Sequence, residues 1–383
     1  MIFPFKINRL TRPVRRASCA ALGLLAMVSC APTTGGGGAC AHPDMAFGGD
    51  VLLHSLIQSD AAGRPEGFAP ALAPIAPALS RAAVSVVNLE GPAARDIGPT
   101  LREEADPGTL FDGRIYSGYP RFNYHPSIAG VLARVGVDVV QTANNHAMDR
   151  GAIGADLTLS ALTQAGLSVT GTSPRGEAQV FHTTRQVSGR TIVFLACTFS
   201  TNGLPDPARQ ALRCYGNQPS IPNLIHSLSQ QSNVDGVVLL PHWGTEYSSR
   251  PNARQRRLAQ SAAEAGAIAI VGAHPHVLQP LDVLTTRDGR RVPVAYSLGN
   301  LISSQWRLER RTGAILYLDL TRNAQGQLEA TGARYLPTRV ERTTNLGVAV
   351  FPAAQLQAGA ASIAHARRVL GAGMVGPDGC LIP

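Results

Sequence analysis

The sequence predicts an α/β protein whose sheet strands are covered on both faces. Three observations lead to this expectation: short apolar runs recur along the chain, segments of helical composition lie between several of them, and the runs are almost continuously apolar. A strand with one face in water alternates polar and apolar residues, whereas a strand buried on both faces does not. The order of strands and helices is that of βαβ units.

Seven apolar runs are predicted to be strands. They are Met45–Leu53, Val84–Leu89, Val137–Thr142, Thr191–Cys197, Val234–Leu240, Ala267–Val271 and Val292–Leu298. Four intervening segments are predicted to be helices, namely Ser127–Val135, Ile153–Ala165, Ile221–Gln231 and Asn252–Ala265. Further along, we expect a closing hairpin of Ile315–Leu320 with Leu328–Leu336, and an Ala-rich helix at Ala353–Leu370.

The chain begins with a segment typical of an export signal. A basic stretch ending at Arg16 precedes an apolar run, Ala17–Val28, that is too short for a permanent membrane anchor. Met27–Cys30 resembles the lipobox of bacterial lipoproteins. We therefore expect residues 1–29 to be removed and Cys30 to be lipidated; plain signal-peptidase cleavage further on is the alternative. The expected location is the periplasm or cell envelope, with the lipid as membrane anchor.

The domain organisation follows from composition. Residues 30–42 contain the run Gly35–Gly38 and are predicted to be a flexible tether. Residues 43–341 are predicted to be the folded domain, and residues 342–383 a C-terminal tail.

The net charge of +9 is concentrated in the predicted signal. Five of the 34 basic residues lie in the first 29 positions, which contain no acidic residue, so the remainder carries 29 basic and 25 acidic residues. That remainder has no basic tract, and we expect no nucleic-acid partner. Lys6 is the only lysine, which excludes a P-loop or a pyridoxal Schiff base in the mature chain.

The cysteines suit an oxidising compartment. Without Cys19 and Cys30 an even number remains, which permits two disulfides. Cys197 and Cys214 flank a loop and are the first predicted pair. Cys40 with Cys380 is the second, for which free thiols are an equal alternative.

Polar residues that can bind metals follow five of the predicted strands. They are Asp50, Glu90, Asn145 with His146, His242, and His274 with His276. Ligands of open α/β sheets bind at the carboxyl ends of the strands, so one architecture would bring these positions to one edge. Imidazole nitrogens and carboxylate oxygens suit Zn, Mn or Fe, and this set is large enough for two ions.

Each of these residues also has a structural explanation by itself. An Asp or Asn after a strand is commonly a turn residue, and His242 beside Trp243 can be a core histidine. His274 and His276 are more informative, because residues two apart on an extended segment point to the same side. The joint occurrence of five such clusters favours a metal site.

Six ordered motifs resemble one family. They are Gly49-Asp50, Asn88-Leu89-Glu90-Gly91, Ala143-Asn144-Asn145-His146-Ala147-Met148-Asp149-Arg150-Gly151, His242-Trp243-Gly244-Thr245-Glu246-Tyr247, Gly272-Ala273-His274-Pro275-His276-Val277 and Tyr296-Ser297-Leu298-Gly299-Asn300. This set is similar to that of CapA-type poly-γ-glutamate capsule biosynthesis proteins, which resemble the calcineurin-like metallophosphoesterase superfamily. The resemblance spans roughly Met45 to Ser303. It implies a four-layer αββα sandwich of the metallophosphoesterase type, a dinuclear metal site and a role in envelope or capsule polymer metabolism.

The resemblance also implies roles for individual residues. Asp50 and His276 would bind the first metal ion, and Glu90 would bridge the two. The ligands of the second ion would be Asn145, His242 and His274. His146 would donate a proton to the leaving group, and Asp149 would fix its tautomer.

Two departures from the superfamily pattern bear on the number of ions. The usual histidine two residues after the first aspartate is Leu52 here, with His54 two positions further on, and Glu90 stands where an aspartate is usual. A complete two-metal site and an incomplete or mononuclear first site are therefore alternatives.

Two functional classes follow from the resemblance. In the first, the protein is a metal-dependent hydrolase or transferase acting on an anionic polymer or phosphoester, with other capsule-export components as possible partners. In the second, it is a non-catalytic component that binds the polymer through its metals during export. Ser-His-Asp catalysis is disfavoured, because the sequence contains no Gly-x-Ser-x-Gly motif.

Overall fold

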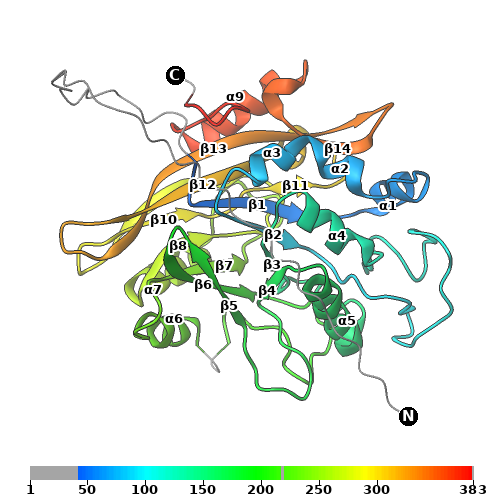
Figure 1. Cartoon of the computed structure of the whole chain (residues 1–383), viewed down its shortest axis with the longest axis horizontal. Coiled ribbons are helices and arrows are strands. Elements are labelled where there is room, and N and C mark those ends of the chain that lie inside the picture. The colour runs from blue at the N-terminus through cyan, green and yellow to red at the C-terminus, as the bar shows by residue number, and fades with distance from the viewer. Residues whose placement is uncertain (1–41, 217–219, 382–383) are drawn as a thin grey trace, which may run out of the picture. The chain divides into compact units, whose positions relative to one another are not determined.

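The computed structural model describes residues 42–216 and 220–381, and these residues form two β-sheets (Figure 1). The first sheet has the order β14-β13-β12-β1-β2-β3-β4, with β11 also paired to β1, and the second has the order β5-β6-β7-β8-β10-β9. The predicted signal (1–29), Cys30, Cys40 and all of the predicted tether except His42 lie outside the described residues.

The strand bounds are as follows. The first sheet contains β1 (Met45–Val51), β2 (Val84–Leu89), β3 (Val139–Gln141), β4 (Ser168–Thr170), β11 (Asn300–Ile302), β12 (Thr312–Arg322), β13 (Leu328–Thr343) and β14 (Gly347–Pro352). The second contains β5 (His182–Val187), β6 (Arg190–Thr198), β7 (Gly236–His242), β8 (Ala267–Val271), β9 (Leu281–Thr285) and β10 (Arg291–Ala295). Strands β1 to β4 run parallel, as do β6, β7, β8 and β10.

The helices are mostly short. They are α1 (Ser55–Ala62), α2 (Ala69–Leu72), α3 (Ala76–Leu79), α4 (Ser127–Arg134), α5 (Gly151–Gln164), α6 (Ile221–Ser229), α7 (Ala253–Glu264), α8 (Leu308–Arg311) and α9 (Gly359–Leu370), with 3-10 turns η1 (Ala73–Ile75) and η2 (Ala353–Gln355). Helix α7 begins with a capping box, in which the side chains of Asn252 and Gln255 each accept the other's backbone N–H.

Alternate residues of the central strands pack into different cores. In β1 and β6, Phe47 and Phe194 lie in a shared core that contains residues of both sheets. Neighbouring residues Ala46 and Leu195 instead lie in two separate outer cores, under the helices. Because both faces of these strands are buried, their sequences are continuously apolar, as predicted.

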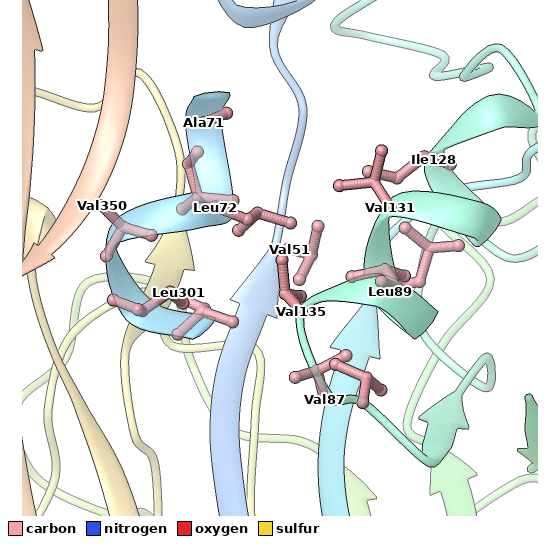
Figure 2. Packing of buried hydrophobic residues seen from close by; sticks show 14 of the residues in the cluster. Val51, Ala71, Leu72, Val87, Leu89, Ile128, Val131, Val135, Leu301 and Val350 are labelled. Atoms are coloured by element: carbon pink, nitrogen blue, oxygen red, sulfur yellow. The ribbon is translucent and has the colours of Figure 1, made fainter. Parts of the chain in front are cut away.

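Helices cover the outer face of each sheet. Figure 2 shows Leu72 of α2 and Val131 of α4 packed around Val51 and Leu89 at the ends of β1 and β2. On the other side, α6 and α7 contribute to the outer core of the second sheet. The order helix, sheet, sheet, helix confirms the predicted four-layer αββα sandwich.

The C-terminal part differs from the predicted tail. The predicted boundary at residue 341 falls inside β13, and β14 follows as the edge strand, antiparallel to β13. The predicted hairpin is observed as β12 and β13, which are longer than expected. The predicted helix Ala353–Leu370 is divided into η2 and α9, and Ala366 of α9 packs into the core between the sheets.

Several short elements were not predicted from the sequence. Strands β4 and β11 have three residues each, and α2, α3 and α8 have four each, which is too short for a hydrophobic period to be recognised.

Among the described residues, no helix combines the length and apolarity needed to cross a bilayer.

The structure places a disulfide between Cys197, in β6, and Cys214, seventeen positions later. The other predicted pair includes Cys40, which lies outside the described residues.

A Gly49→Ala substitution should destabilise the fold. A Cβ atom at position 49 would lie 1.9 Å from the carbonyl oxygen of Gly299, which accepts a hydrogen bond from the backbone of Asp50. We expect the free energy of unfolding in urea to fall by about 1–3 kcal/mol or more. Gly63→Ala is the control, because its Cβ would have only ordinary contacts at 3.7 Å or more. Equal stability of the two variants would contradict the close approach.

Loss of the disulfide should also destabilise the protein. Cys214→Ala opens a loop with a sequence separation of 17, and the chain-entropy estimate for a loop of this size is about 3 kcal/mol. The urea midpoint of the variant should lie below that of the oxidised wild type and at or above that of the reduced wild type, because reduction also breaks the disulfide of Cys380. If reduction leaves the wild-type midpoint unchanged, the cross-link is absent or does not stabilise the fold.

Candidate metal centre

Strand register fixes Asp50 at the centre of the site. In the first sheet Asp50 lies opposite Asn88 of β2 on one side and Asn300 of β11 on the other. The Asn88 side-chain amide donates to Asp50 Oδ1 at 2.8 Å, and Asp50 Oδ2 lies 3.2 Å from His276 Nδ1. That same nitrogen lies 3.0 Å from Asn300 Oδ1. The carboxylate of Asp50 is therefore held in a fixed, fully buried position.

Glu90 directly follows β2 and is fully buried, yet neither carboxylate oxygen has a hydrogen-bond partner among the described residues. Its Oε1 lies 3.5 Å from His242 Nε2 and 3.7 Å from His276 Nε2. Burial by itself would raise the pKa of Glu90, but His276 and His242 outweigh burial and lower this pKa. The carboxylate is thus ionised and unsolvated, an arrangement that costs several kcal/mol unless a cation lies beside it.

Glu90 belongs to two groups of side chains that could each hold a metal ion. One group is Glu90, His242 and His274, and the other is Asp50, Glu90 and His276; in each, the ligand atoms lie within 4.8 Å of one another. All of these residues are buried. Because the groups share Glu90, this carboxylate lies between them.

Asn145 lies on the His242 side of the cluster. Its Oδ1 is 2.7 Å from His242 Nε2, and its Nδ2 donates to Asn202 Oδ1 at 3.2 Å. His274 lies beside them, with its ring centroid 4.9 Å from that of His242, and its buried Nδ1 has no hydrogen-bond partner among the described residues. Burial and the nearby His242 lower the pKa of His274 well below its usual value, so its nitrogen lone pair is available.

His276 compensates the two carboxylates in the metal-free arrangement. Burial alone would lower its pKa, but Glu90 and Asp50 raise it to about 9. The protonated ring therefore supplies positive charge where a bound cation would supply it.

The backbone around these histidines is strained. His274 has a backbone φ angle of +100° and His276 one of +56°, values that residues other than glycine rarely adopt. The segment is therefore a turn and not the extended chain expected from the i, i+2 spacing. The two rings still lie together, with centroids 5.9 Å apart, because the turn after β8 directs both into the cluster.

His146 and Asp149 form a pair beside the cluster. His146 Nδ1–H donates to Asp149 Oδ2 at 2.7 Å, and that oxygen also accepts the backbone N–H of Phe122. Burial alone would lower the pKa of His146, but the hydrogen bond and charge of Asp149 outweigh burial and raise this pKa. The imidazole is thereby fixed in one tautomer, with its Nε2 free of this interaction.

Arg150 secures the long segment between β2 and α4 next to this pair. Its buried guanidinium donates to the carbonyl oxygens of Ile97, Arg114 and Ile115 and to Ser117 Oγ. Burial lowers the pKa of Arg150 to about 10. The same segment provides Phe122, whose ring packs edge-on against His146 with centroids 4.8 Å apart.

The structure thus brings together the six predicted metal ligands and places the predicted catalytic pair next to them. Sequence reasoning assigned no role to four further residues of the site: Asn88, Asn300, His54 and Glu246. Asn88 and Asn300 belong to two of the six motifs, and their positions beside predicted strand ends would have indicated that they lie near the metal ligands. The pKa of His54 is lowered to about 4, mainly by burial and to a smaller extent by repulsion from His276. Glu246 forms a third group that could hold a metal ion, together with His274 and His276.

Comparisons with known proteins place this chain in a family. A sequence model described as "Bacterial capsule synthesis protein PGA_cap" matches residues 44–305. The PGA biosynthesis protein CapA of Bacillus subtilis (strain 168) is 33% identical over 208 residues, which are 52% of this chain and 52% of that protein. The capsule biosynthesis protein CapA of Bacillus anthracis is 30% identical over 203 residues, 52% of this chain and 48% of that protein.

The chain spans about half the length of these curated relatives. Among solved structures, the NAD nucleotidase of Haemophilus influenzae aligns with a TM-score of 0.44 at 14% identity, covering 87% of this chain and 57% of that one. The family match covers more than half of the chain and includes every residue of the cluster. The chain therefore belongs to the family of bacterial capsule synthesis proteins described as PGA_cap.

Proposed function

We propose that this protein is an exported, lipid-anchored and metal-dependent hydrolase or transferase that acts on an anionic envelope polymer such as poly-γ-glutamate during capsule biosynthesis. The proposal rests on Glu90, a fully buried carboxylate that lies between His242 and His276 and has no hydrogen-bond partner in residues 42–216 and 220–381. Protonated His276 offsets the charge of Glu90 in the metal-free arrangement, but the two carboxylate oxygens still accept no hydrogen bond from the described residues, and bound metal ions would occupy them.

The donor set fits two divalent ions, with Mn, Zn or Fe as candidates. Asp50 and His276 would hold one ion, Asn145, His242 and His274 would hold the other, and Glu90 would contact both. Bound ions would supply a water molecule of lowered pKa and would neutralise charge on the substrate oxygens.

The remaining chemistry belongs to the side chains of this chain. His146 would hold a proton on Nε2 and release it to the leaving group, while Asp149 keeps Nδ1 protonated and the ring oriented. A purely structural metal site has no need for such a pair, which supports turnover over simple binding.

The substrate class rests on the relatives. Both curated relatives are named for biosynthesis of the capsule or of PGA. A poly-γ-glutamate chain carries one carboxylate per residue, and metal ions beside the scissile bond would attract such a polyanion. Other capsule-export components are the partners we expect.

The proposed location rests on two independent features. The expected signal and lipidated Cys30 direct the chain to the periplasm or cell envelope. The disulfide between Cys197 and Cys214 supports the same location, because such bonds persist in oxidising compartments.

Glu90→Gln should reduce metal content. The variant keeps the size of the side chain but removes the charge between the two groups of ligands, so we expect protein purified without chelator to lose about one equivalent of metal or more by elemental analysis. His226→Gln, on the outer helix α6, is the control for nonspecific binding by histidine. Wild-type protein without bound metal, or unchanged metal content in Glu90→Gln, would remove the basis of the proposal.

His146→Ala should separate chemistry from binding. Because His146 is not among the proposed ligands, we expect metal content to stay at the wild-type level while the rate of hydrolysis of γ-glutamyl or phosphoester substrates falls about 10²–10⁴-fold. If the variant instead retains full function in the cell, the protein is a non-catalytic receptor that binds the polymer through its metal ions.

A further inference from the structure

A cavity of about 290 Å³ lies beside the metal centre, between the segment around α8 and helix α9. Its walls include Tyr247, Arg307, Arg310 and His365. Three of these residues, Arg307, Arg310 and His365, lie beyond residue 305, where the family match ends. The cavity is therefore built largely from a part of the chain outside the family match.

Direct contacts link this cavity to the metal centre. The Tyr247 ring lies with its centroid 6.0 Å from that of His276, and the guanidinium carbon of Arg310 lies 3.5 Å above the same tyrosine ring. The Asn300 side chain, which contacts His276, donates to the backbone carbonyl of Arg310 at 2.8 Å. A group bound in the cavity would thus be one side chain away from a proposed metal ligand.

The charges around the cavity favour an anion. Arg307 and Arg310 line it, and neither forms an ion pair with an acidic side chain of the described residues. Glu309 also lines the cavity and partly opposes them. Arg368 adds a further positive charge, since it contacts His365 from the neighbouring turn of α9.

His365 supplies a polar group without a partner. Its side chain belongs to a residue that is only 5% exposed, and its Nδ1 lies 2.8 Å from the Arg368 guanidinium, which can only donate. The ring proton is therefore on Nε2, and this buried N–H has no acceptor among the described residues. A buried donor of this kind is normally satisfied, and an oxygen atom of a ligand in the cavity would satisfy it after a small movement of the ring.

We propose that this cavity binds a free α-carboxylate of the γ-linked polymer, one residue away from the bond presented to the metal centre. The inference rests on the proposed function and adds a substrate-recognition site to it. Arg307 and Arg310 provide the charge and His365 the additional N–H. Recognition of the polymer would then depend on the segment beyond residue 305 as well as on the metal ligands.

Binding of short oligomers tests the proposal without requiring turnover. Calorimetry on the full metal-loaded chain would compare a γ-linked glutamate pentamer with a γ-linked isoglutamine pentamer of the same length, in which each free α-carboxylate is replaced by a neutral carboxamide. We expect the wild type to prefer the glutamate pentamer, and Arg307→Gln/Arg310→Gln to weaken its binding about tenfold while leaving binding of the isoglutamine pentamer unaffected. Glu309→Gln should change affinity in the opposite direction, tightening binding of the glutamate pentamer.

Arg287→Gln/Arg291→Gln is the matched control, because it also removes two arginine charges, from exposed positions of the β9–β10 hairpin that do not line the cavity. Wild-type affinity in the double arginine variant, or no preference of the wild type for the glutamate pentamer, would overturn the proposal. Loss of affinity for a glycerol phosphate oligomer but not for the glutamate pentamer would also overturn it, in favour of a phosphate site.

The same measurements separate this inference from the proposed function. A charge preference that depends on the two arginines, in a protein that hydrolyses nothing, would support the cavity and contradict the hydrolase. Hydrolysis with an unchanged KM and unchanged affinity in the double variant would support the hydrolase and overturn the cavity.

Discussion

The buried negative charge of Glu90 is the constraint around which the rest of the site is organised. Its carboxylate accepts no hydrogen bond from the part of the chain that the structure describes, and it is stabilised by the imidazoles of His242 and His276. Those rings are held in turn by Asn88, Asn145 and Asp50. Both sheets contribute, since Glu90 follows a strand of the first and His242 ends a strand of the second. A shift of one sheet relative to the other would therefore separate the charge from its partners.

The sequence predicted this arrangement where a single physical rule governed it. Continuously apolar runs occur because central strands are buried on both faces, and parallel strands place their carboxyl ends at one edge, so Asp50, Glu90 and His242 could be grouped from the sequence. The rest depends on long-range geometry. Asn300 joins the site through β11, a three-residue strand with no recognisable period, and the left-handed turn at His274 is imposed by its surroundings.

The structure of the C-terminal segment also could not be predicted from its sequence. An Ala-rich stretch with a Gly-rich end has the composition of an appended tail, yet Ala366 and Leu370 of α9 pack into the core between the two sheets. Small apolar residues fit closely against strands without a strong amphipathic pattern, because little side-chain volume has to be accommodated. Strand β14 extends the first sheet beyond the predicted boundary as its edge strand, and Val348 and Val350 of this strand pack in the outer core under the helices.

The contact between Asp50 and His276 joins positions that are 226 residues apart in the chain. A cation that needs both side chains could be captured only after β1 and the turn after β8 have come together. Affinity alone selects poorly among first-row transition metals, and supply commonly decides which ion is taken up. The surroundings in which this chain completes its folding would consequently determine which ions reach the proposed metal centre.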